Sequence, residues 1–253
     1  MKIGLVQYNP KWEDIEGNKA EIKNLLKEIT SDTDLLIFPE LTLTGFTMNP
    51  EKYCSSLKTG NIDFFTAIAK ERGTNIVFGD IIADGSDFFN TLLLLDRKGE
   101  LKNHYFKIHP FSYGEENRHY SAGKELIIAN IDGVKTGLSI CYDLRFPELY
   151  RFYGKQRVDL LINIANWPIT RIHHWRALLR ARAIENQAFV VAVNRTGNDP
   201  HLQYNGCSSV FSPMGDELCC IEDEVKIHLT EIDLGTVSEV RKKFPFLEDI
   251  KLI

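Results

Sequence analysis

The chain lacks any run of apolar residues that approaches the about 20 needed for a membrane-spanning helix. Residues 1–7 have neither the apolar core nor the small-residue cleavage site of a secretory signal peptide. Basic residues are not in excess either, since 30 Lys and Arg against 35 Asp and Glu give a net charge of −5. Binding to nucleic-acid backbones needs clustered positive charge. The sequence therefore predicts a cytoplasmic protein without a membrane or nucleic-acid partner.

Cysteine is scarce, and its pattern is not that of a disulfide or metal framework. The five cysteines show no Cys-x-x-Cys spacing, and an odd number leaves at least one thiol without an intrachain partner. Reduced thiols fit a reducing compartment. No His-Glu-x-x-His or paired Cys/His spacing occurs among the seven histidines, and no glycine-rich phosphate loop is present. We therefore expect neither a metal ion nor an organic cofactor.

Nothing in the sequence divides the chain into parts. No repeat, low-complexity segment or Pro/Gly/Ser-rich linker occurs, so we expect one domain over residues 1–253. Apolar periodicity predicts helices over 14–29, 61–72 and 173–187, and Pro147 favours a helix that begins near it. Short apolar runs predict strands at 3–8, 34–38, 75–82, 91–96, 136–141, 160–164, 189–194, 208–211 and 226–232.

The order of these elements predicts an α/β fold with mixed sheets. Helices separate some strands, whereas the runs 76–82 and 91–95 are joined through the turn residues Asp84-Gly85-Ser86-Asp87, as in a hairpin. A chain that combines β-α-β units with hairpins gives mixed sheets covered by helices rather than one purely parallel sheet.

Three reactive side chains follow predicted strands. Glu40 ends the run 35–40, Cys141 ends the run 136–141, and Lys107 follows the short aromatic-rich segment 104–106. Ligands of layered α/β folds collect beyond the carboxyl ends of strands. We therefore expect an acid, an amine and a thiol at one edge of the fold.

Cys141 lies at a predicted corner between a strand and a helix. Backbone N–H groups at the amino end of a helix, together with a nearby cation, favour a thiolate and can hold an oxyanion. A free thiol is only a few per cent ionised at neutral pH, so it needs a base that accepts its proton. Glu40 and Lys107 can supply the base and the cation.

At these residues the sequence resembles the nitrilase superfamily of carbon–nitrogen hydrolases, which carries a Glu–Lys–Cys triad in this chain order. The resemblance extends from residue 1 to about residue 233, and the combination of motifs is far more specific than any one of them. The matching segments are Phe38-Pro39-Glu40-Leu41 with Thr44-Gly45-Phe46, Tyr105-Phe106-Lys107-Ile108-His109, Ser139-Ile140-Cys141-Tyr142-Asp143-Leu144-Arg145-Phe146-Pro147-Glu148-Leu149, and Ala181-Arg182-Ala183-Ile184-Glu185-Asn186-Gln187.

The resemblance implies an α-β-β-α four-layer sandwich with two mixed β-sheets. It implies a homodimer joined through the helix after the nucleophile and the helix near residues 173–187. It also implies hydrolysis of a small-molecule amide by Glu40, Lys107 and Cys141, with the oxyanion held by Lys107 and the backbone N–H of Tyr142. A second glutamate supports the lysine in many members, and it falls on Glu116, with Glu115 as the neighbouring candidate.

The residues around the cysteine indicate a branch of the superfamily. Nitrilases proper have Trp directly after the cysteine, whereas this chain has Tyr142. The segment is similar to Nit-type amidases and, with Asn166-Trp167-Pro168, most similar to bacterial ω-amidases, which act on short 2-oxo acid monoamides such as 2-oxoglutaramate and 2-oxosuccinamate.

A substrate of this kind needs a cation for its carboxylate. Arg145 is the first candidate and Arg171 the second, and the resemblance makes Phe46 and Trp167 apolar walls. Either arginine could instead pair with a nearby acid such as Asp143 or Glu148.

Three alternatives remain open from the sequence. A deaminated-glutathione amidase shares the same cysteine segment, and a carbamoylase belongs to the same superfamily. A binding or scaffold protein on this fold is a different class, although it would have no need for three polar groups at one edge. Ammonia release from a panel of amides separates these alternatives.

Overall fold

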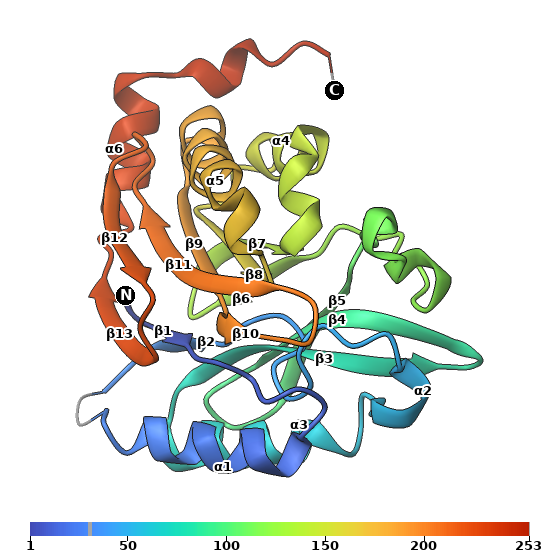
Figure 1. Ribbon diagram of the computed structural model, residues 1–253. Coiled ribbons are helices and arrows are strands. Elements are labelled where there is room, and N and C mark those ends of the chain that lie inside the picture. The colour runs from blue at the N-terminus through green and yellow to red at the C-terminus, as the bar shows by residue number, and fades with distance from the viewer. Residues whose placement is uncertain (30–31, 253) are drawn as a thin grey trace.

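Two β-sheets lie face to face at the centre of the computed structural model, which describes residues 1–29 and 32–252 (Figure 1). The first sheet has the order β13-β1-β2-β3-β4-β5. Its strands are parallel between β1, β2 and β3 and antiparallel elsewhere. Their bounds are β1 Lys2–Gln7, β2 Leu35–Ile37, β3 Asn75–Asp84, β4 Asp87–Leu95, β5 Leu101–Phe106 and β13 Lys226–Glu231.

The second sheet has the order β10-β11-β9-β8-β7-β6, and β12 pairs with β11. Strands β7, β8 and β9 are parallel to one another, whereas the other pairs are antiparallel. Their bounds are β6 Ile128–Ile131, β7 Val134–Ile140, β8 Leu160–Ala165, β9 Phe189–Asn194, β10 Thr196–Asn198, β11 Gln203–Phe211 and β12 Glu217–Glu222.

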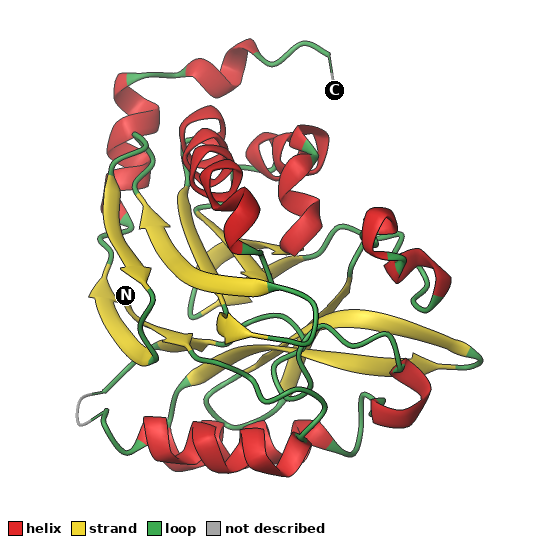
Figure 2. Ribbon diagram, viewed as in Figure 1, coloured by secondary structure: helices red, strands yellow, loops and turns green. Residues whose placement is uncertain are grey.

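Helices cover the outer faces of both sheets (Figure 2). Helices α1 and α3 lie on the first sheet, and α4 and α5 lie on the second, which gives the four layers of an α-β-β-α sandwich. The predicted fold class is therefore confirmed. The helix bounds are α1 Ile15–Leu26, α2 Pro50–Tyr53, α3 Asn61–Arg72, α4 Pro147–Lys155, α5 Ile172–Asn186 and α6 Gly235–Lys243.

The alternation of side chains along β2 explains why both of its faces are apolar. Leu35 and Ile37 belong to the core between the two sheets, whereas Leu36 and Phe38 belong to the core under α1 and α3. Because successive strand residues point to opposite faces, a central strand of a four-layer sandwich must be apolar at every position. This is the physical reason for the short continuous apolar runs in the sequence.

The sequence missed elements that carry little apolar periodicity. β6 and β10 are only four and three residues long, and α2 is a single turn. α6 buries only Val237 and Val240, so its apolar face is too narrow to stand out. Within the described ranges, none of the helices combines the length and apolar character required to cross a bilayer.

Candidate active site

Strand ends from both sheets bring the three reactive side chains together. Glu40 follows β2 and Lys107 directly follows β5 in the first sheet, whereas Cys141 directly follows β7 in the second. All three side chains therefore lie just after strands, as the sequence predicts. The site lies where the carboxyl ends of these strands meet between the layers.

The Glu40 segment crosses close to β3, and Gly79 makes this approach possible. A Cβ atom at Gly79 would lie 2.4 Å from the backbone N of Leu41 and 2.9 Å from Cα of Glu40. Thr42 fixes the crossing because its backbone N donates to Gly79 O at 2.9 Å and its hydroxyl accepts from Gly79 N at 3.0 Å. These two hydrogen bonds to Gly79 therefore fix the backbone next to Glu40.

Lys107 lies between two buried carboxylates. Its Nζ donates to Oε1 of Glu40 at 2.8 Å and to Oε2 and Oε1 of Glu116 at 2.8 and 3.1 Å. All three side chains are at most 1% exposed. Burial alone would lower the pKa of Lys107, but the carboxylates of Glu116 and Glu40 outweigh it and raise this pKa. The ammonium form is therefore favoured at neutral pH.

The structure places Glu116, and not Glu115, against the lysine. Glu116 begins a short 3-10 turn and is fully buried, whereas Glu115 is exposed and pairs with Arg118 at 2.6 Å. Burial raises the pKa of the Glu116 carboxyl, Lys107 opposes this effect, and Glu40 adds to it. The buried set thus holds two carboxyl groups against one ammonium.

Two asparagines that the sequence analysis gave no role hold the carboxylates in place. Nδ2 of Asn90, in β4, donates to Glu40 Oε1 at 2.7 Å and to Glu116 Oε1 at 2.8 Å. The backbone N of Asn166 donates to Glu40 Oε2 at 2.8 Å, and its side chain donates to Glu40 O. Asn166 is part of the Asn166-Trp167-Pro168 motif, but Asn90 gives no signal of its own in the sequence.

Cys141 begins a 3-10 turn, Cys141–Arg145, in a left-handed backbone conformation with φ of 44°. A non-glycine residue in this region is uncommon, and such positions concentrate at functional sites. Its side chain is 9% exposed. The sulfur is therefore fixed at the edge of the buried charge cluster.

The buried surroundings of Cys141 favour its thiol over its thiolate, so the base expected from the sequence is required. Burial raises the pKa of Cys141, and the Glu40 carboxylate adds to this effect, while Lys107 only partly opposes it. Helix α4 begins at Pro147, so its amino end is several residues beyond the sulfur. These effects favour the protonated thiol, which transfers its proton to a base in order to react.

Asp143 fastens the cysteine turn to the lysine segment. Its Oδ2 accepts from Ile140 N at 3.0 Å and from the Tyr105 hydroxyl at 2.7 Å, and its Oδ1 accepts from His109 N at 3.0 Å. These bonds join the residues on both sides of Lys107 to the strand end before Cys141. Asp143 is therefore occupied and is not the partner of Arg145.

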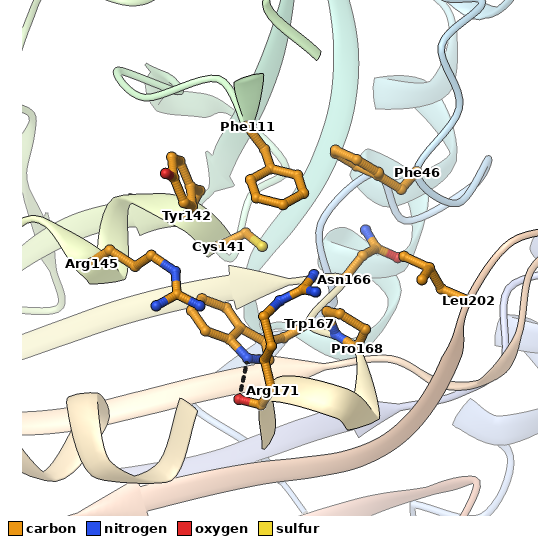
Figure 3. A pocket seen from close by; sticks show the side chains of 10 residues that line it. All are labelled: Phe46, Phe111, Cys141, Tyr142, Arg145, Asn166, Trp167, Pro168, Arg171 and Leu202. Carbon is orange, nitrogen blue, oxygen red and sulfur yellow. Dashed lines mark hydrogen bonds between the residues drawn. The ribbon is translucent and has the colours of Figure 1, made fainter. Parts of the chain in front are cut away.

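A pocket opens in front of the cysteine (Figure 3). Phe46, Trp167 and Tyr142 line it as expected, and Trp167 is fixed by its indole N–H, which donates to Arg171 O at 2.8 Å. Its other lining residues are Phe111, Cys141, Arg145, Asn166, Pro168, Arg171 and Leu202.

Both candidate arginines face this pocket without an acidic partner. The Arg145 guanidinium lies 4.8 Å from the Trp167 ring centre, and that of Arg171 lies 5.6 Å from the Phe111 ring centre. Arg145 also contacts His174 Nδ1 at 3.3 Å. Across residues 1–29 and 32–252, no carboxylate forms an ion pair with either arginine. The pairing with Asp143 or Glu148 is therefore not formed.

Comparison with known proteins gives the same picture as the geometry. The family model described as carbon-nitrogen hydrolase matches residues 2–242. A 2-oxoglutaramate amidase of Bacillus subtilis (strain 168) is 36% identical over 251 residues, with 98% of this chain and 97% of the relative covered. The Omega-amidase YafV of Escherichia coli (strain K12) is 34% identical over 252 residues, with 98% and 96% covered.

A solved structure is also similar over the whole chain. XC1258 from Xanthomonas campestris, a CN-hydrolase superfamily protein with an arsenic adduct in its active site, superimposes with a TM-score of 0.93. It is 32% identical in sequence, and the match covers 100% of this chain and 98% of that one.

Proposed function

The chain belongs to the carbon–nitrogen hydrolase family and is an amidohydrolase, and from this premise we propose its substrate and the roles of its residues. The substrate is a short 2-oxo acid monoamide of the 2-oxoglutaramate or 2-oxosuccinamate type. The enzyme hydrolyses the terminal amide to an acid and ammonia through a thioester on Cys141. Relatives named for the same activity support the proposal.

One observation carries the choice of substrate. Arg145 and Arg171 direct two cations with no ion-pair partner in the described structure toward a pocket whose walls are mostly apolar. A substrate carboxylate that enters such a pocket loses water, which is unfavourable unless the carboxylate is paired with a cation. The carboxylate of the substrate supplies the missing partner, and a guanidinium binds carboxylates in a planar, two-point arrangement.

In the first half-reaction, Glu40 accepts the proton of the Cys141 thiol while the sulfur attacks the amide carbon. Glu40 is the base because its Oε2 accepts from the backbone N and, at 3.3 Å, from the side chain of Asn166, and has no bond to Lys107 among the described residues, whereas both Glu116 oxygens are held by Lys107 and a second donor. The oxyanion is stabilised by Lys107 and by the backbone N–H of Tyr142. An ammonium has three donors, and Lys107 directs them to Glu40 Oε1 and to both oxygens of Glu116. The oxyanion replaces the longest of these bonds, the one of 3.1 Å to Glu116 Oε1.

The same carboxyl group then changes role. Glu40 gives its proton to the departing ammonia as the first tetrahedral intermediate collapses to the thioester, which completes the first half-reaction. In the second half-reaction the Glu40 carboxylate takes a proton from the water that attacks the thioester, and it returns this proton to the Cys141 sulfur when the bond between sulfur and carbon breaks. The charge of Lys107 suits both half-reactions, because each passes through a tetrahedral intermediate with a negative oxygen. Hydrolysis by this route uses no metal ion and no organic cofactor.

The test compares acid-bearing and neutral amides of equal length. We expect kcat/KM for 2-oxoglutaramate to exceed that for pentanamide by about 100-fold or more, because a site built around a charge rejects the uncharged analogue. In Arg145→Ala or Arg171→Ala this preference should fall by about 10- to 100-fold, the effect of one charged hydrogen bond. Arg180→Ala is the matched control, since Arg180 lies on α5 and does not line the pocket.

Equal rates for the two amides in the wild-type enzyme would refute the 2-oxo acid proposal. If deaminated glutathione or an N-carbamoyl acid were the best substrate of the panel, the chain would instead be a deaminated-glutathione amidase or a carbamoylase.

We further propose that residues 1–253 act as one domain and form a cytoplasmic homodimer through α4 and α5. Phe152 on α4 and Ile184 on α5 are 38% and 49% exposed, and apolar side chains of this size favour burial at an interface. Sedimentation of the wild type should give twice the chain mass, and Ile184→Glu should give the monomer. A monomeric wild type would refute the dimer.

A further inference from the structure

Two cysteines and a glutamate meet on the second sheet, outside the active site. Strands β11 and β12 pair with Gly206 opposite Glu222 and Ser209 opposite Cys220, so Cys207 is an extra residue in a β-bulge. Cys207 has φ of 58°, in the left-handed region. Bulges redirect side chains, and here the bulge directs the Cys207 sulfur toward β12.

The ligand atoms of the three residues are already close enough to surround one ion. The sulfurs of Cys207 and Cys220 and a carboxylate oxygen of Glu222 all lie within 4.8 Å of one another. Zinc binds sulfur at about 2.3 Å and carboxylate oxygen at about 2.1 Å. Two ligands of one zinc ion are thus at most about 4.6 Å apart, and small side-chain movements close the site.

We propose that Cys207, Cys220 and Glu222 bind a thiophilic divalent cation of the zinc type. Thiolates select this class of ion over calcium or magnesium. Three protein ligands leave the fourth tetrahedral position to water. The sequence shows no metal-binding spacing motif for this site. Its ligands come from two strands joined by a turn, and the position of the Cys207 sulfur depends on a bulge.

The surroundings of the sulfurs fit metal-bound thiolates. Asn205 Nδ2 donates to the Cys207 sulfur at 3.7 Å, as an outer partner of a metal-bound thiolate does.

Arg176 is the competitor for the carboxylate. Its Nη1 contacts Glu222 Oε1 at 3.2 Å, and its Nη2 donates to Glu217 Oε2 at 2.8 Å. The arginine side chain is 43% exposed, so it can release Glu222 and keep Glu217. Glu222 then turns to the ion without leaving the guanidinium unpaired.

An ion at this place stabilises the wall behind the substrate pocket. Trp175 Nε1 donates to Cys207 O at 2.8 Å, and the Trp175 and Trp167 rings are 5.4 Å apart. Gly206 O accepts from Asn194 Nδ2, whose side-chain oxygen accepts from Trp167 N at 2.7 Å. A cation that joins β11 to β12 fixes the bulge on which this wall rests.

The test uses the full chain with Cys141→Ala, which removes the catalytic thiol as a second metal-binding group. The protein is freed of metal with a chelator in a phosphine reductant and titrated with Co²⁺, which reports thiolate binding through its charge-transfer absorbance. We expect one equivalent to bind, Zn²⁺ to displace it, and saturating Zn²⁺ to raise the Tm by roughly 5 °C or more.

Variants decide whether these three residues hold the ion. Cys220→Ser and Cys207→Ser should abolish the absorbance, and Glu222→Gln should weaken binding by at least about 10-fold. Cys219→Ser, next to Cys220 in the same strand, is the matched control and should bind as the parent does. Glu222→Gln changes an exposed side chain, so a folded variant is assured even if Cys207→Ser is unstable.

Two results would overturn the proposal. One is Co²⁺ binding that persists in Cys220→Ser and Glu222→Gln. The other is a chain that binds no Co²⁺ and instead forms a Cys207–Cys220 disulfide on exposure to air, detected by mass spectrometry without reductant.

Discussion

Replacing Glu116 by glutamine should slow turnover without weakening substrate binding. Each Glu116 oxygen accepts from two donors: Oε1 from Asn90 and Lys107, and Oε2 from Lys107 and the backbone N of Phe111. A glutamine amide brings its NH₂ group against one of these pairs, whichever way it turns. At least one hydrogen bond to the Lys107 ammonium is then lost.

The size of the effect follows from that bond. A hydrogen bond to a charged group contributes about 1.5–3 kcal/mol, and each 1.36 kcal/mol is about tenfold in rate. If the transition state loses this much stabilisation by Lys107, kcat falls by about 10- to 150-fold. KM should change little, because Glu116 does not line the pocket.

The neighbouring glutamate gives the matched control. Glu115→Gln removes the same charge one residue away, where the side chain is 58% exposed and pairs with Arg118. Its kcat should remain within about twofold of the wild type. The assay is ammonia release from 2-oxoglutaramate, coupled to glutamate dehydrogenase, with circular dichroism as the check on folding. A normal kcat for Glu116→Gln, or a large loss for Glu115→Gln, would refute the assignment of the second glutamate.

Three further predictions concern the buried groups. Cys141→Ala should lower kcat by about 1000-fold or more with an unchanged far-UV spectrum, whereas Cys54→Ser should retain activity; ammonia release by Cys141→Ala at the normal rate would exclude it as the nucleophile. Glu40→Gln and Lys107→Arg should each lose most of kcat at near-native stability, because glutamine accepts no proton and a planar guanidinium does not replace a compact ammonium. Single-turnover mass spectrometry should find no thioester in Glu40→Gln. If the thioester accumulates in this variant, Glu40 is not the base of the first step. Burial raises the pKa of Asp80 to about 6, so the folded state holds this proton more tightly than the unfolded state, and stability falls as pH rises from about 4 to about 6. Relative to Asp80→Asn, the wild type should lose up to about 3 kcal/mol of unfolding free energy across that range. Urea denaturation at pH 4 and 7.5 measures this difference, and an equal change in both proteins would contradict the assignment.

The sequence alone predicted most of the central strands and helices. Central strands of a four-layer sandwich are apolar on both faces, so runs such as 160–164 and 189–194 are visible without any structure. The prediction of α3 over 61–72 matches the structure at both ends, because its apolar face is periodic and Gly73 ends it in the left-handed conformation. The positions of Glu40, Lys107 and Cys141 followed from the same local logic, since each comes just after a strand.

Only the tertiary structure decided which groups surround these three. Asn90 is one polar residue in an apolar strand, and its two carboxylate partners are 50 and 26 residues away in the chain. Glu115 and Glu116 are equivalent in sequence, and a left-handed residue at Glu115 turns one outward and the other inward. The raised pKa of Cys141 likewise comes from burial and from Glu40, about a hundred residues before it in the chain.

Contacts between distant segments also decide the surroundings of the two pocket arginines and of the cluster formed by Cys207, Cys220 and Glu222. Asp143 is close to Arg145 in the sequence, but in the folded chain its carboxylate accepts hydrogen bonds from Tyr105 and His109, and Arg145 faces the pocket instead. Local periodicity records which face of an element is buried. The partner of a buried polar group is set by contacts between distant segments, and those contacts exist only once the two sheets have packed together.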